Sequence, residues 1–254
     1  MVHRPQKPVI WVTRPQLNAS DTMRKLADLG FNPIAAPLMT YEWQVNTEDK
    51  RVCLKNLEVD GFVITSQAVF AAPWDDVSKD KIRSKQIYCV GQKTAKIASE
   101  FGCEHIIVGP GNGIALAEML NKNNAQSTNQ KEICYLTGQP RRDSFEKTLS
   151  KELFQLHIQE VYQANYVEEM PIAIEKPWQS GEVHIVLLYS PQAANSFMAC
   201  ISKAKHMEHI IKDKRLLICC LSQQVADALK NDRFLVKVAE KADEAHLFAL
   251  LSQY

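Results

Sequence analysis

The segment CVGQKTA, residues 89–95, has the residue types of an anion-binding turn, because a glycine, a lysine and a threonine stand between an apolar run and an amphipathic one. A Walker phosphate loop needs a further glycine upstream, and this chain lacks it. We predict instead that a strand ends at Gly91 and that a helix begins near Thr94. The unpaired amides and the positive dipole end of such a helix attract anions. In the alternative interpretation, Gly91 makes a tight turn and Thr94 caps the helix.

Side chains that could bind a metal ion are scattered along the chain. His206 and His209 are close in sequence but have no third ligand nearby, and the chain has no Cys-x-x-Cys pair. Seven cysteines stand at positions 53, 89, 103, 134, 200, 219 and 220. Several lie in apolar runs such as LLICCL, which is typical of reduced, buried cysteines. We therefore predict no metal site, and we interpret the two histidines as part of a surface helix.

The elements that would position an anion-binding turn alternate between short apolar runs and longer amphipathic ones. VIWVT, FVIT and IYCV have the composition of buried strands, and helices are expected at about 20–29, after Ser66 and after Gly91. This alternation predicts an α/β fold in which helices cover parallel sheets. Ligands of such sheets bind at the carboxyl ends of strands, where the strand-to-helix turns gather.

The same rhythm repeats after the polar stretch NKNNAQSTNQ. VIWVTRPQ with Thr13 corresponds to ICYLTGQP with Thr137, and FVITSQAVF with Ser66 corresponds to VLLYSPQAANSF with Ser190; each match is 124 positions later (137 − 13 and 190 − 66). The CVGQKTA turn recurs as CCLSQQVA, with Ser222 in the glycine position. We therefore predict two similar α/β units. The alternative is chance likeness between buried strands.

Composition limits the classes of partner. With 254 residues, 46% of them hydrophobic, the chain can bury a large core in one or two domains. Thirty basic and 29 acidic residues give a net charge of +1, which does not favour nucleic acid or an anionic membrane as a partner. The chain shows neither a signal peptide nor an apolar run long enough to span a membrane. We expect a cytoplasmic protein.

In order and spacing, several segments resemble the uroporphyrinogen-III synthase family, and the resemblance covers nearly the whole chain. They are VTRPQ at 12–16, FVITSQAV at 62–69, CVGQKTAKIASEFG at 89–102, GPGNGIALAEML at 109–120, YLTGQPRRDSFEKTL at 135–149, QEVYQANY at 159–166 and LLYSPQAANSF at 187–197. Each segment is short, but their common order and spacing are specific.

This resemblance implies two flavodoxin-like parallel-sheet domains joined by two extended linker strands. Domain 1 would be discontinuous, formed by residues 1–37 and 168–254, and domain 2 would be inserted as residues 42–161. The linkers would lie near 37–42 and 162–167. The segments PLMTYEW and VYQANYV occupy equivalent repeat positions, as paired linkers require.

The resemblance also implies a reaction: a hydro-lyase of tetrapyrrole and heme biosynthesis cyclises hydroxymethylbilane to uroporphyrinogen III, with loss of water and inversion of ring D. It implies no metal or organic cofactor. The substrate is flexible and carries eight carboxylates, which strand-to-helix turns can bind through many amides without a basic protein. We expect a monomer whose partner is this small molecule, with no nucleic acid and no membrane.

The resemblance singles out Tyr162 as the candidate catalytic residue, a proton donor to the departing hydroxyl group. The alternative is an ordinary half-buried tyrosine, because a phenol with a pKa near 10 is a weak acid unless its site tunes it. Substrate-binding residues are expected at the turns of both halves. They are Thr13, Arg14, Ser66, Gly91, Thr94, Asn112, Arg141, Ser190 and Ser222.

Some of these residues have competing structural roles. Arg14 could form a bidentate pair with a carboxylate, or it could hold a neighbouring loop. Ser66 and Ser190 can bind an anion and cap a helix at once. Asn112 is favoured as a turn residue over a carboxylate donor. Arg141, together with Arg142, either supplies positive charge to the site or is a solvated surface pair.

The chain departs from the family pattern at CCLSQQVADALK, where a second Gly-x-Thr-Thr-Ala turn is expected. Ser222 keeps a hydroxyl there, but the following residues are Gln223, Gln224 and Val225, which puts substrate contacts at this turn in doubt. Ala68 likewise stands where some members have a basic residue. The competing hypothesis from another class is a non-catalytic two-domain protein that binds an anion or a tetrapyrrole.

Overall fold

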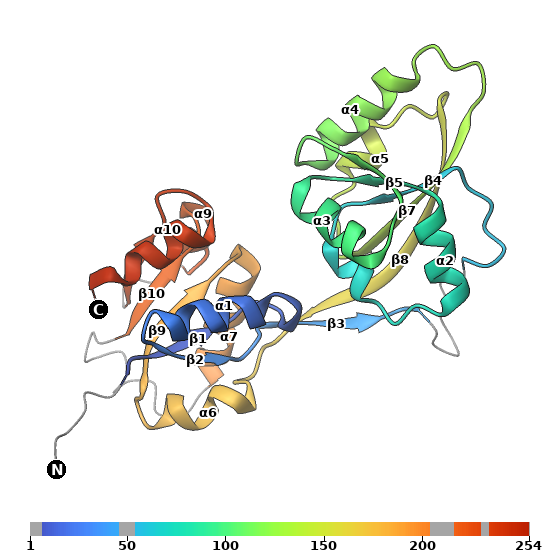
Figure 1. Cartoon of the computed structure of the whole chain (residues 1–254). Helices are drawn as coiled ribbons and strands as arrows, with labels where there is room; N and C mark the ends of the chain where they lie inside the picture. Colours follow the sequence, from blue (N-terminus) through green and yellow to red (C-terminus); the bar gives the residue numbers. More distant parts are fainter. Residues whose placement is uncertain (1–6, 46–53, 204–215, 230–233, 254) are drawn as a thin grey trace. The chain divides into compact units, whose positions relative to one another are not determined.

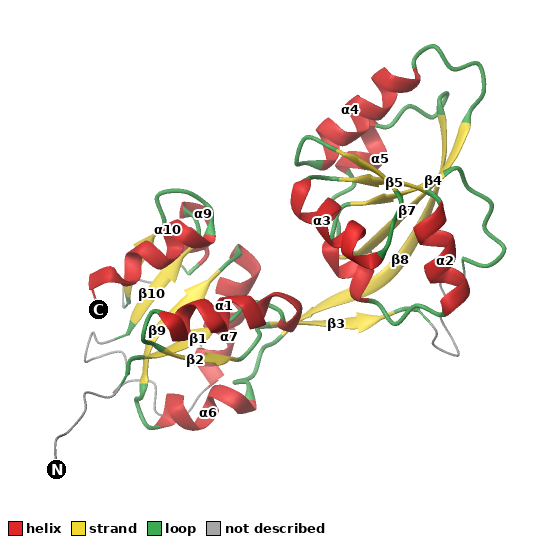
Figure 2. Cartoon of the chain, viewed as in Figure 1, coloured by secondary structure: helices red, strands yellow, loops and turns green. Residues whose placement is uncertain are grey.

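The computed structural model describes residues 7–45, 54–203, 216–229 and 234–253, which form two compact units (Figure 1). Unit 1 contains Met1–Thr40 and Asn165–Tyr254, and unit 2 contains Tyr41–Ala164. Both are mixed α/β units (Figure 2). The polar stretch 121–130 lies inside unit 2, where it covers the end of one helix and the turn before the next strand, and it does not separate the units. The predicted α/β class with two parallel sheets is confirmed.

Unit 1 is built on a five-stranded sheet of the order β11-β10-β9-β1-β2, and every pairing in it is parallel. Numbered along the chain, this order is 2-1-3-4-5, the flavodoxin-like arrangement. The strands are β1 (Val9–Val12), β2 (Asn32–Ala35), β9 (Val183–Leu188), β10 (Leu217–Cys220) and β11 (Leu235–Val238). The strands β1 and β10 are buried along their whole length, because helices cover both faces of the sheet.

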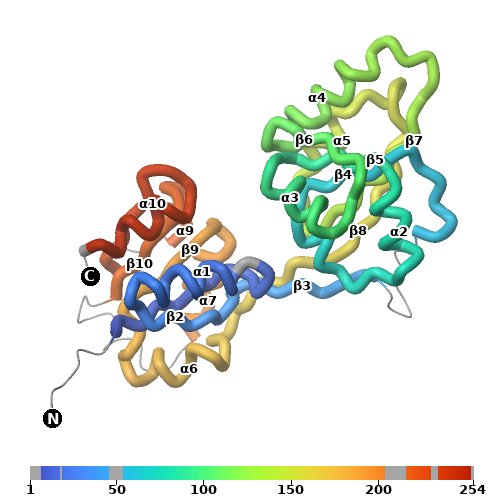
Figure 3. Tube along the Cα trace, viewed as in Figure 1, coloured from blue at the N-terminus to red at the C-terminus, as the bar shows by residue number. Residues whose placement is uncertain are grey.

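The helices of unit 1 divide between the two faces of its sheet. They are η1 (Gln16–Asn18), α1 (Ala19–Asp28), α6 (Ile172–Gln179), α7 (Pro191–Lys203), α9 (Gln223–Ala228), α10 (Glu244–Ala249) and η3 (Leu250–Gln253). One core contains Trp178 of α6 and Phe197 of α7, which pack edge-on against Trp11. The other contains Leu26 of α1 and Leu247 of α10. Figure 3 shows that this unit is assembled from the two ends of the chain, blue and orange to red.

Unit 2 carries a six-stranded sheet of the order β3-β8-β7-β4-β5-β6. Its strands are β3 (Met39–Trp43), β4 (Gly61–Ile64), β5 (Gln86–Cys89), β6 (His105–Val108), β7 (Lys131–Gln139) and β8 (Phe154–Tyr166). Its helices are η2 (Gln67–Ala71), α2 (Asp76–Ser84), α3 (Gln92–Phe101), α4 (Gly113–Asn124) and α5 (Ser144–Thr148). The core on one face includes residues of η2, α2 and α3, and the core on the other includes residues of α4 and α5.

The strands that the internal repeat matches occupy equivalent positions in the two sheets. The strand β1 lies between β2 and β9, and its repeat mate β7 lies between β8 and β4. The second matched pair, β4 and β9, occupies the neighbouring central position in each sheet. Because unit 2 starts at a different strand, its order is a circular permutation of the order in unit 1.

The chain crosses between the units twice, within β3 and within β8. In unit 1 the two crossing segments are joined to each other, since the amide of Val167 donates to the carbonyl of Leu38 at 3.1 Å. The hydroxyl of Ser196 on α7 lies within hydrogen-bonding reach of both of these residues' carbonyls. A core helix of unit 1 therefore fixes both strands where they enter the unit.

Two predicted helices are present but differ in detail from the expectation. The helix expected to begin near Thr94 begins earlier, at Gln92, because Gly91 is extended and its carbonyl accepts the first helical bond from Ala95 at 3.1 Å. Thr94 is therefore a buried residue of the first turn and not the cap. The helix expected after Ser66 is a short 3-10 helix, η2.

Six cysteines lie in the described part of the chain, and all six are free and buried. Burial raises the pKa of the Cys134 thiol to about 12, so the thiol form is strongly favoured at neutral pH. Cys53, His206 and His209 lie outside the described residues. Across the described ranges, no helix is both long and apolar enough to span a bilayer.

Candidate functional site

A pocket of about 550 Å³ lies within unit 2, beside the carboxyl ends of β4 and β7. Strand ends, the loop before α4 and the loop before α5 supply its walls. The lining residues are Thr65, Asn112, Gly113, Ile114, Tyr135, Thr137, Gly138, Pro140, Arg141, Arg142, Ser144, Phe145 and Tyr162. Three of the residues proposed from the sequence, Asn112, Arg141 and Tyr162, meet here. The position agrees with the rule that parallel sheets bind ligands at the carboxyl ends of their strands.

The charge of the pocket favours an anion, because two arginines and no carboxylate side chain are among its described lining residues. Arg141 is already paired: its Nε lies 2.7 Å from Glu146 Oε1, and its Nη1 lies 2.6 Å from Glu160 Oε1. The hydrogen bond to Glu146, with that to Glu160, raises the pKa of Arg141. Arg142 is exposed, and no ion pair or hydrogen bond of its side chain occurs within the described residues. Arg142 is therefore the arginine of this pocket that can bind a ligand carboxylate without losing a hydrogen bond to another described residue.

The start of α4 adds amide donors to the same wall. Asn112 is the N-cap of this helix, and its Oδ1 accepts a hydrogen bond from the amide of Ala115 at 2.9 Å. The amides of Gly113 and Ile114, both at the pocket, have no acceptor within the helix, as at any helix start. Asn112 thus acts through its capping bond, which orients a helix N-terminus toward the pocket.

Tyr162 reaches the pocket because of a bulge between β7 and β8. Thr137 pairs with Glu160 and the next residue, Gly138, pairs with Tyr162, so Val161 is the extra residue. A Cβ atom placed on Gly138 would lie 2.1 Å from the Tyr162 ring, which therefore packs directly over the glycine backbone. Bulges commonly redirect a side chain beside a functional site.

Two further aromatic rings fix the orientation of Tyr162. Its ring meets Tyr41 edge-on with centroids 5.0 Å apart and Trp43 at 6.1 Å. Tyr41 and Trp43 stack on each other at 5.5 Å. The phenol is thus held on a rigid aromatic support while one edge lines the pocket.

The pocket also contains hydroxyl groups that the sequence analysis missed. Thr65 Oγ1 and the Tyr135 hydroxyl are 2.8 Å apart, and both residues line the pocket. The signal for Thr65 was its place at the end of FVIT, directly before Ser66. Tyr135 gave no such signal, because in ICYLT it has the pattern of an apolar strand residue.

The Gly91 turn packs against the loop that borders the pocket but does not line the pocket itself. A Cβ atom on Gly91 would lie 3.3 Å from the Cα atom of Gly111, which shows that this turn packs against the loop that carries Asn112. Thr94 is 6% exposed and Ser66 caps η2, with its Oγ accepting from the amide of Ala68 at 3.2 Å. None of these three residues is among the residues that line the pocket.

The remaining predicted residues lie in unit 1. Thr13 is 1% exposed and donates to the carbonyl of Leu187 at 2.6 Å, so its hydroxyl joins β1 to β9. Ser190 caps α7 through the amide of Ala193 at 3.1 Å. Ser222 stands at the N-cap of α9, as Gly91 does for α3, and its side chain makes no capping bond.

Arg14 holds a neighbouring element of unit 1. Its Nη1 donates to Glu244 Oε1 at 2.6 Å and to Thr22 Oγ1 at 2.8 Å, and its guanidinium lies 4.6 Å from the centre of the Tyr189 ring. Lys25 adds a second contact to Glu244 at 2.8 Å. Among the described residues, Arg14 Nε is left buried without a hydrogen-bond partner. The contacts correspond to the structural alternative for Arg14, a bridge from β1 to α10.

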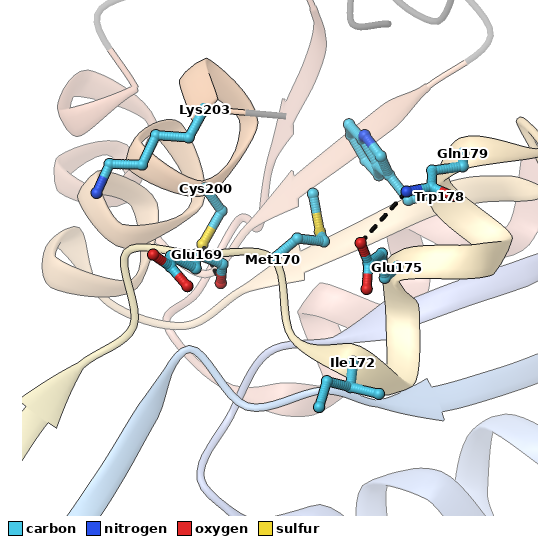
Figure 4. Close-up of a pocket in the computed structure, with 8 residues that line it drawn as sticks. All are labelled: Glu169, Met170, Ile172, Glu175, Trp178, Gln179, Cys200 and Lys203. Atoms are coloured by element: carbon cyan, nitrogen blue, oxygen red, sulfur yellow. Dashed lines mark hydrogen bonds between the residues drawn. The ribbon is translucent and has the colours of Figure 1, made fainter. Parts of the chain in front are cut away.

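A second pocket, of about 470 Å³, lies in unit 1 and is less suited to an anionic ligand (Figure 4). Glu169 and Glu175 line it, and Glu175 accepts from Gln179 at 3.3 Å. Its single described basic side chain, Lys203, is paired with Glu168 at 3.0 Å. The pocket also lies at the carboxyl end of α7, where the helix dipole repels anions. In the described part of the chain, no group of three or more His, Cys, Asp and Glu side chains is placed to hold a metal ion.

Comparisons with known proteins agree with this architecture. A sequence model described as Uroporphyrinogen-III synthase HemD matches residues 20–249. Among curated proteins, none matches the chain significantly. The uroporphyrinogen-III synthetase of Helicobacter pylori is similar in structure, with a TM-score of 0.63 and 12% identity over 98% of this chain and 100% of that one. A mutant uroporphyrinogen III synthase of the extremely thermophilic bacterium Thermus thermophilus has a TM-score of 0.52 and 16% identity over 97% and 96%.

At these identities the structural likeness establishes the fold, whereas the sequence model covers most of the chain and identifies the family. The family match agrees with the resemblance first seen in the turn motifs. The chain belongs to the uroporphyrinogen-III synthase family, the cyclising enzymes of tetrapyrrole biosynthesis.

Proposed function

We propose that the pocket of unit 2 is where this chain binds hydroxymethylbilane and assists its closure to uroporphyrinogen III. The observation that carries the proposal is the meeting, in one pocket that no described carboxylate lines, of a supported tyrosine, a helix N-terminus and an arginine without a partner among the described residues. A volume of about 550 Å³ suits a ligand of drug size. Four linked pyrroles are larger, so the pocket receives one end of the tetrapyrrole.

Substrate carboxylates bind at two places in this proposal. Arg142 pairs with one carboxylate, and the amides of Gly113 and Ile114 bind another at the positive end of α4. Arg141 acts indirectly, since its two glutamate partners hold the loop that presents Arg142. Thr13, Arg14, Ser66, Gly91, Thr94, Ser190 and Ser222 remain proposed substrate-binding residues, with their turn amides as the donors.

Tyr162 protonates the departing hydroxyl group. The carbon–oxygen bond of the hydroxymethyl group breaks with electron release from the pyrrole nitrogen, and the hydroxyl leaves as water with the phenol proton. The methylene carbon so formed bonds to the substituted ring carbon of the last pyrrole, and the bond from that ring carbon to the neighbouring bridge carbon breaks. The bridge carbon then bonds to the free ring carbon on the other side, which inverts the ring, and the proton that this ring carbon loses restores the phenol. Water is the net by-product, so the balance needs no oxidant or reductant.

The proposal extends to the setting of the enzyme. We infer a cytoplasmic monomer that takes a small-molecule substrate and has no nucleic-acid partner. The near-neutral total charge supports the last point, because nothing in it attracts a polyanion. Size-exclusion chromatography with light scattering measures the mass directly; a mass well above 28.8 kDa would contradict a monomer.

The isomer of the product tests the function. Hydroxymethylbilane closes spontaneously to the type I isomer, whereas the proposed enzyme gives type III. Purified protein is incubated with fresh hydroxymethylbilane, and the product is oxidised and separated by chromatography. Type III product at a rate proportional to protein concentration is expected. Type I product alone would leave a non-catalytic binding protein as the better description.

A further inference from the structure

We propose that Tyr135 is a positioning residue of this reaction, which turns the hydroxyl of Thr65 toward a substrate carboxylate in the unit 2 pocket. This inference rests on the proposed function of that pocket. It concerns a pair of residues, Thr65 on the turn after β4 and Tyr135 on β7, whose oxygens are 2.8 Å apart. Neither residue has a role in the proton transfer assigned to Tyr162.

Sheet geometry brings the pair together. Val63 of β4 is in register with Tyr135 of β7, and Thr65 lies two residues beyond Val63. Side chains two residues apart on an extended chain point to the same face. The Tyr135 ring therefore lies beneath the Thr65 side chain, held by the ring of Phe145 at a centroid distance of 5.1 Å.

The direction of the Thr65–Tyr135 hydrogen bond follows from the acceptors that each hydroxyl can reach. Tyr135 is 3% exposed, and Thr65 Oγ1 is the partner of its hydroxyl among the described residues. If Thr65 donated, the phenol proton of this almost fully buried residue would have no acceptor among the described residues, which is costly. With Tyr135 as the donor, the unused proton belongs to Thr65, which is half-buried and lines the pocket. Thr65 then offers its O–H to the ligand.

A donor oriented in this way suits a carboxylate. A hydroxyl that already accepts one hydrogen bond is a stronger donor in the next, because the bonds polarise one another. Hydrogen bonds to charged groups are also stronger than those between neutral groups. Thr65 thus supplements Arg142 and the α4 amides, and Tyr135 acts only through Thr65.

A double-mutant cycle separates this role from simple packing. The variants are Thr65→Val, which keeps the branched shape, Tyr135→Phe, and the double variant. Tyr88→Phe is the matched control: Tyr88 is 5% exposed, belongs to the same core and flanks Val63 on the opposite side, from β5. The measurements are the Kd for reduced uroporphyrinogen III by calorimetry and the KM and kcat for hydroxymethylbilane.

We expect Thr65→Val to weaken product binding about tenfold, the scale of one hydrogen bond to a charged group. Tyr135→Phe should weaken it several-fold with a rise in KM and little change in kcat, and the double variant should equal Thr65→Val. Thr65→Ser should keep both tight binding and the sensitivity to Tyr135→Phe. Tyr88→Phe should bind as the wild type does.

Independent losses that multiply in the double variant would overturn the inference, as would wild-type binding by Tyr135→Phe. If Tyr135→Phe does not fold, the two Thr65 variants still test the inference. Tight product binding by Thr65→Ser and weak binding by Thr65→Val would support Thr65 as a donor, whereas equal binding by the two variants would overturn that role. Type III production by the wild type separates the two proposals. If the wild type neither makes type III product nor binds the product, the proposed function and the role of Tyr135 both fail. If it does both, the proposed function stands, and the double-mutant cycle alone decides on Tyr135.

Discussion

Tyr162, the proposed proton donor, is held in place by its surroundings. Its ring packs over Gly138 and meets Tyr41 and Trp43 edge-on. Removing only the hydroxyl therefore leaves the aromatic packing intact. General acid assistance contributes about 10²- to 10⁴-fold, and this leaving group also departs with help from pyrrole nitrogen.

We therefore expect Tyr162→Phe to lower turnover by about 10- to 100-fold, the low end of that range, while type III selectivity is kept. Steady-state rates and isomer ratios on the folded variant decide the matter. Wild-type turnover would reduce Tyr162 to a packing residue. A switch to type I product would mean that it steers the inversion of ring D.

Gly138 should matter as much as the tyrosine it supports. A methyl group at this position would overlap the Tyr162 ring, since its Cβ would lie 2.1 Å from a ring atom. Gly138→Ala should therefore push the ring aside and lower turnover at least as much as Tyr162→Phe does. In the double variant with both Gly138→Ala and Tyr162→Phe, turnover should be little lower than in Tyr162→Phe alone.

Gly113→Ala is the matched control for that variant. Gly113 lines the same pocket, but its added Cβ would meet Phe145 at 3.4 Å, which is an ordinary contact. This variant should keep most of the turnover. Equal activity of the two alanine variants would show that the position of the Tyr162 ring is not critical.

At the scale of elements, Glu244 joins α10 to α1 and to the end of β1 through Arg14, Thr22 and Lys25. Burial alone would raise the pKa of Glu244, but the hydrogen bonds from Lys25 and Thr22 and the charge of Arg14 outweigh it and lower the pKa. A lowered pKa in the folded state means that the contact stabilises the protein above the ordinary glutamate pKa, about 4.3. That stabilisation is lost as the pH falls through the lowered value.

Glu244→Gln should accordingly lower the free energy of unfolding by about 1 kcal/mol at pH 7, and the difference from wild type should shrink below about pH 4. Urea unfolding at several pH values measures both. Asp21→Asn is a suitable control, because Asp21 also pairs with Lys25 but is exposed. A loss for Glu244→Gln that stays constant down to acid pH would exclude the ionic explanation.

Elements differed in how well the sequence predicted them. Buried strands such as β1 and β4 were recognised from apolar composition, and the repeat matched them correctly with β7 and β9, which occupy the equivalent central positions of the other sheet. The start of α3 was misplaced, since Gly91 and Thr94 are both plausible near a helix start and only backbone geometry separates them.

Contacts within the site were less predictable than strands. The bulge that turns Tyr162 over Gly138, the pairing of Arg141 with Glu146 and Glu160, and the Thr65–Tyr135 contact all join residues from different elements. Sequence spacing gives residue types at strand ends, but not which hydroxyl or guanidinium is already paired. Pairing decides that Arg142, rather than Arg141, is available to a ligand.

At the scale of the molecule, unit 2 is a continuous segment with its own core. Its two hydrophobic clusters, one on each face of the sheet, draw their buried residues from Val45 to Val161. We expect residues 41–164 expressed alone to fold, because a domain of this size with a complete core needs no residue from unit 1. Circular dichroism during urea titration should show one cooperative transition. A fragment without such a transition would show that unit 2 depends on the rest of the chain.

The central claim is that the unit 2 pocket receives the tetrapyrrole, and hydrogen–deuterium exchange on the intact protein tests it most directly. Backbone amides are compared with and without saturating uroporphyrinogen III, kept reduced. The account predicts slower exchange in the segments 112–116 and 137–146, which carry the start of α4 and the arginine loop. Unchanged exchange in both segments, with calorimetry confirming that the ligand is bound, would contradict it.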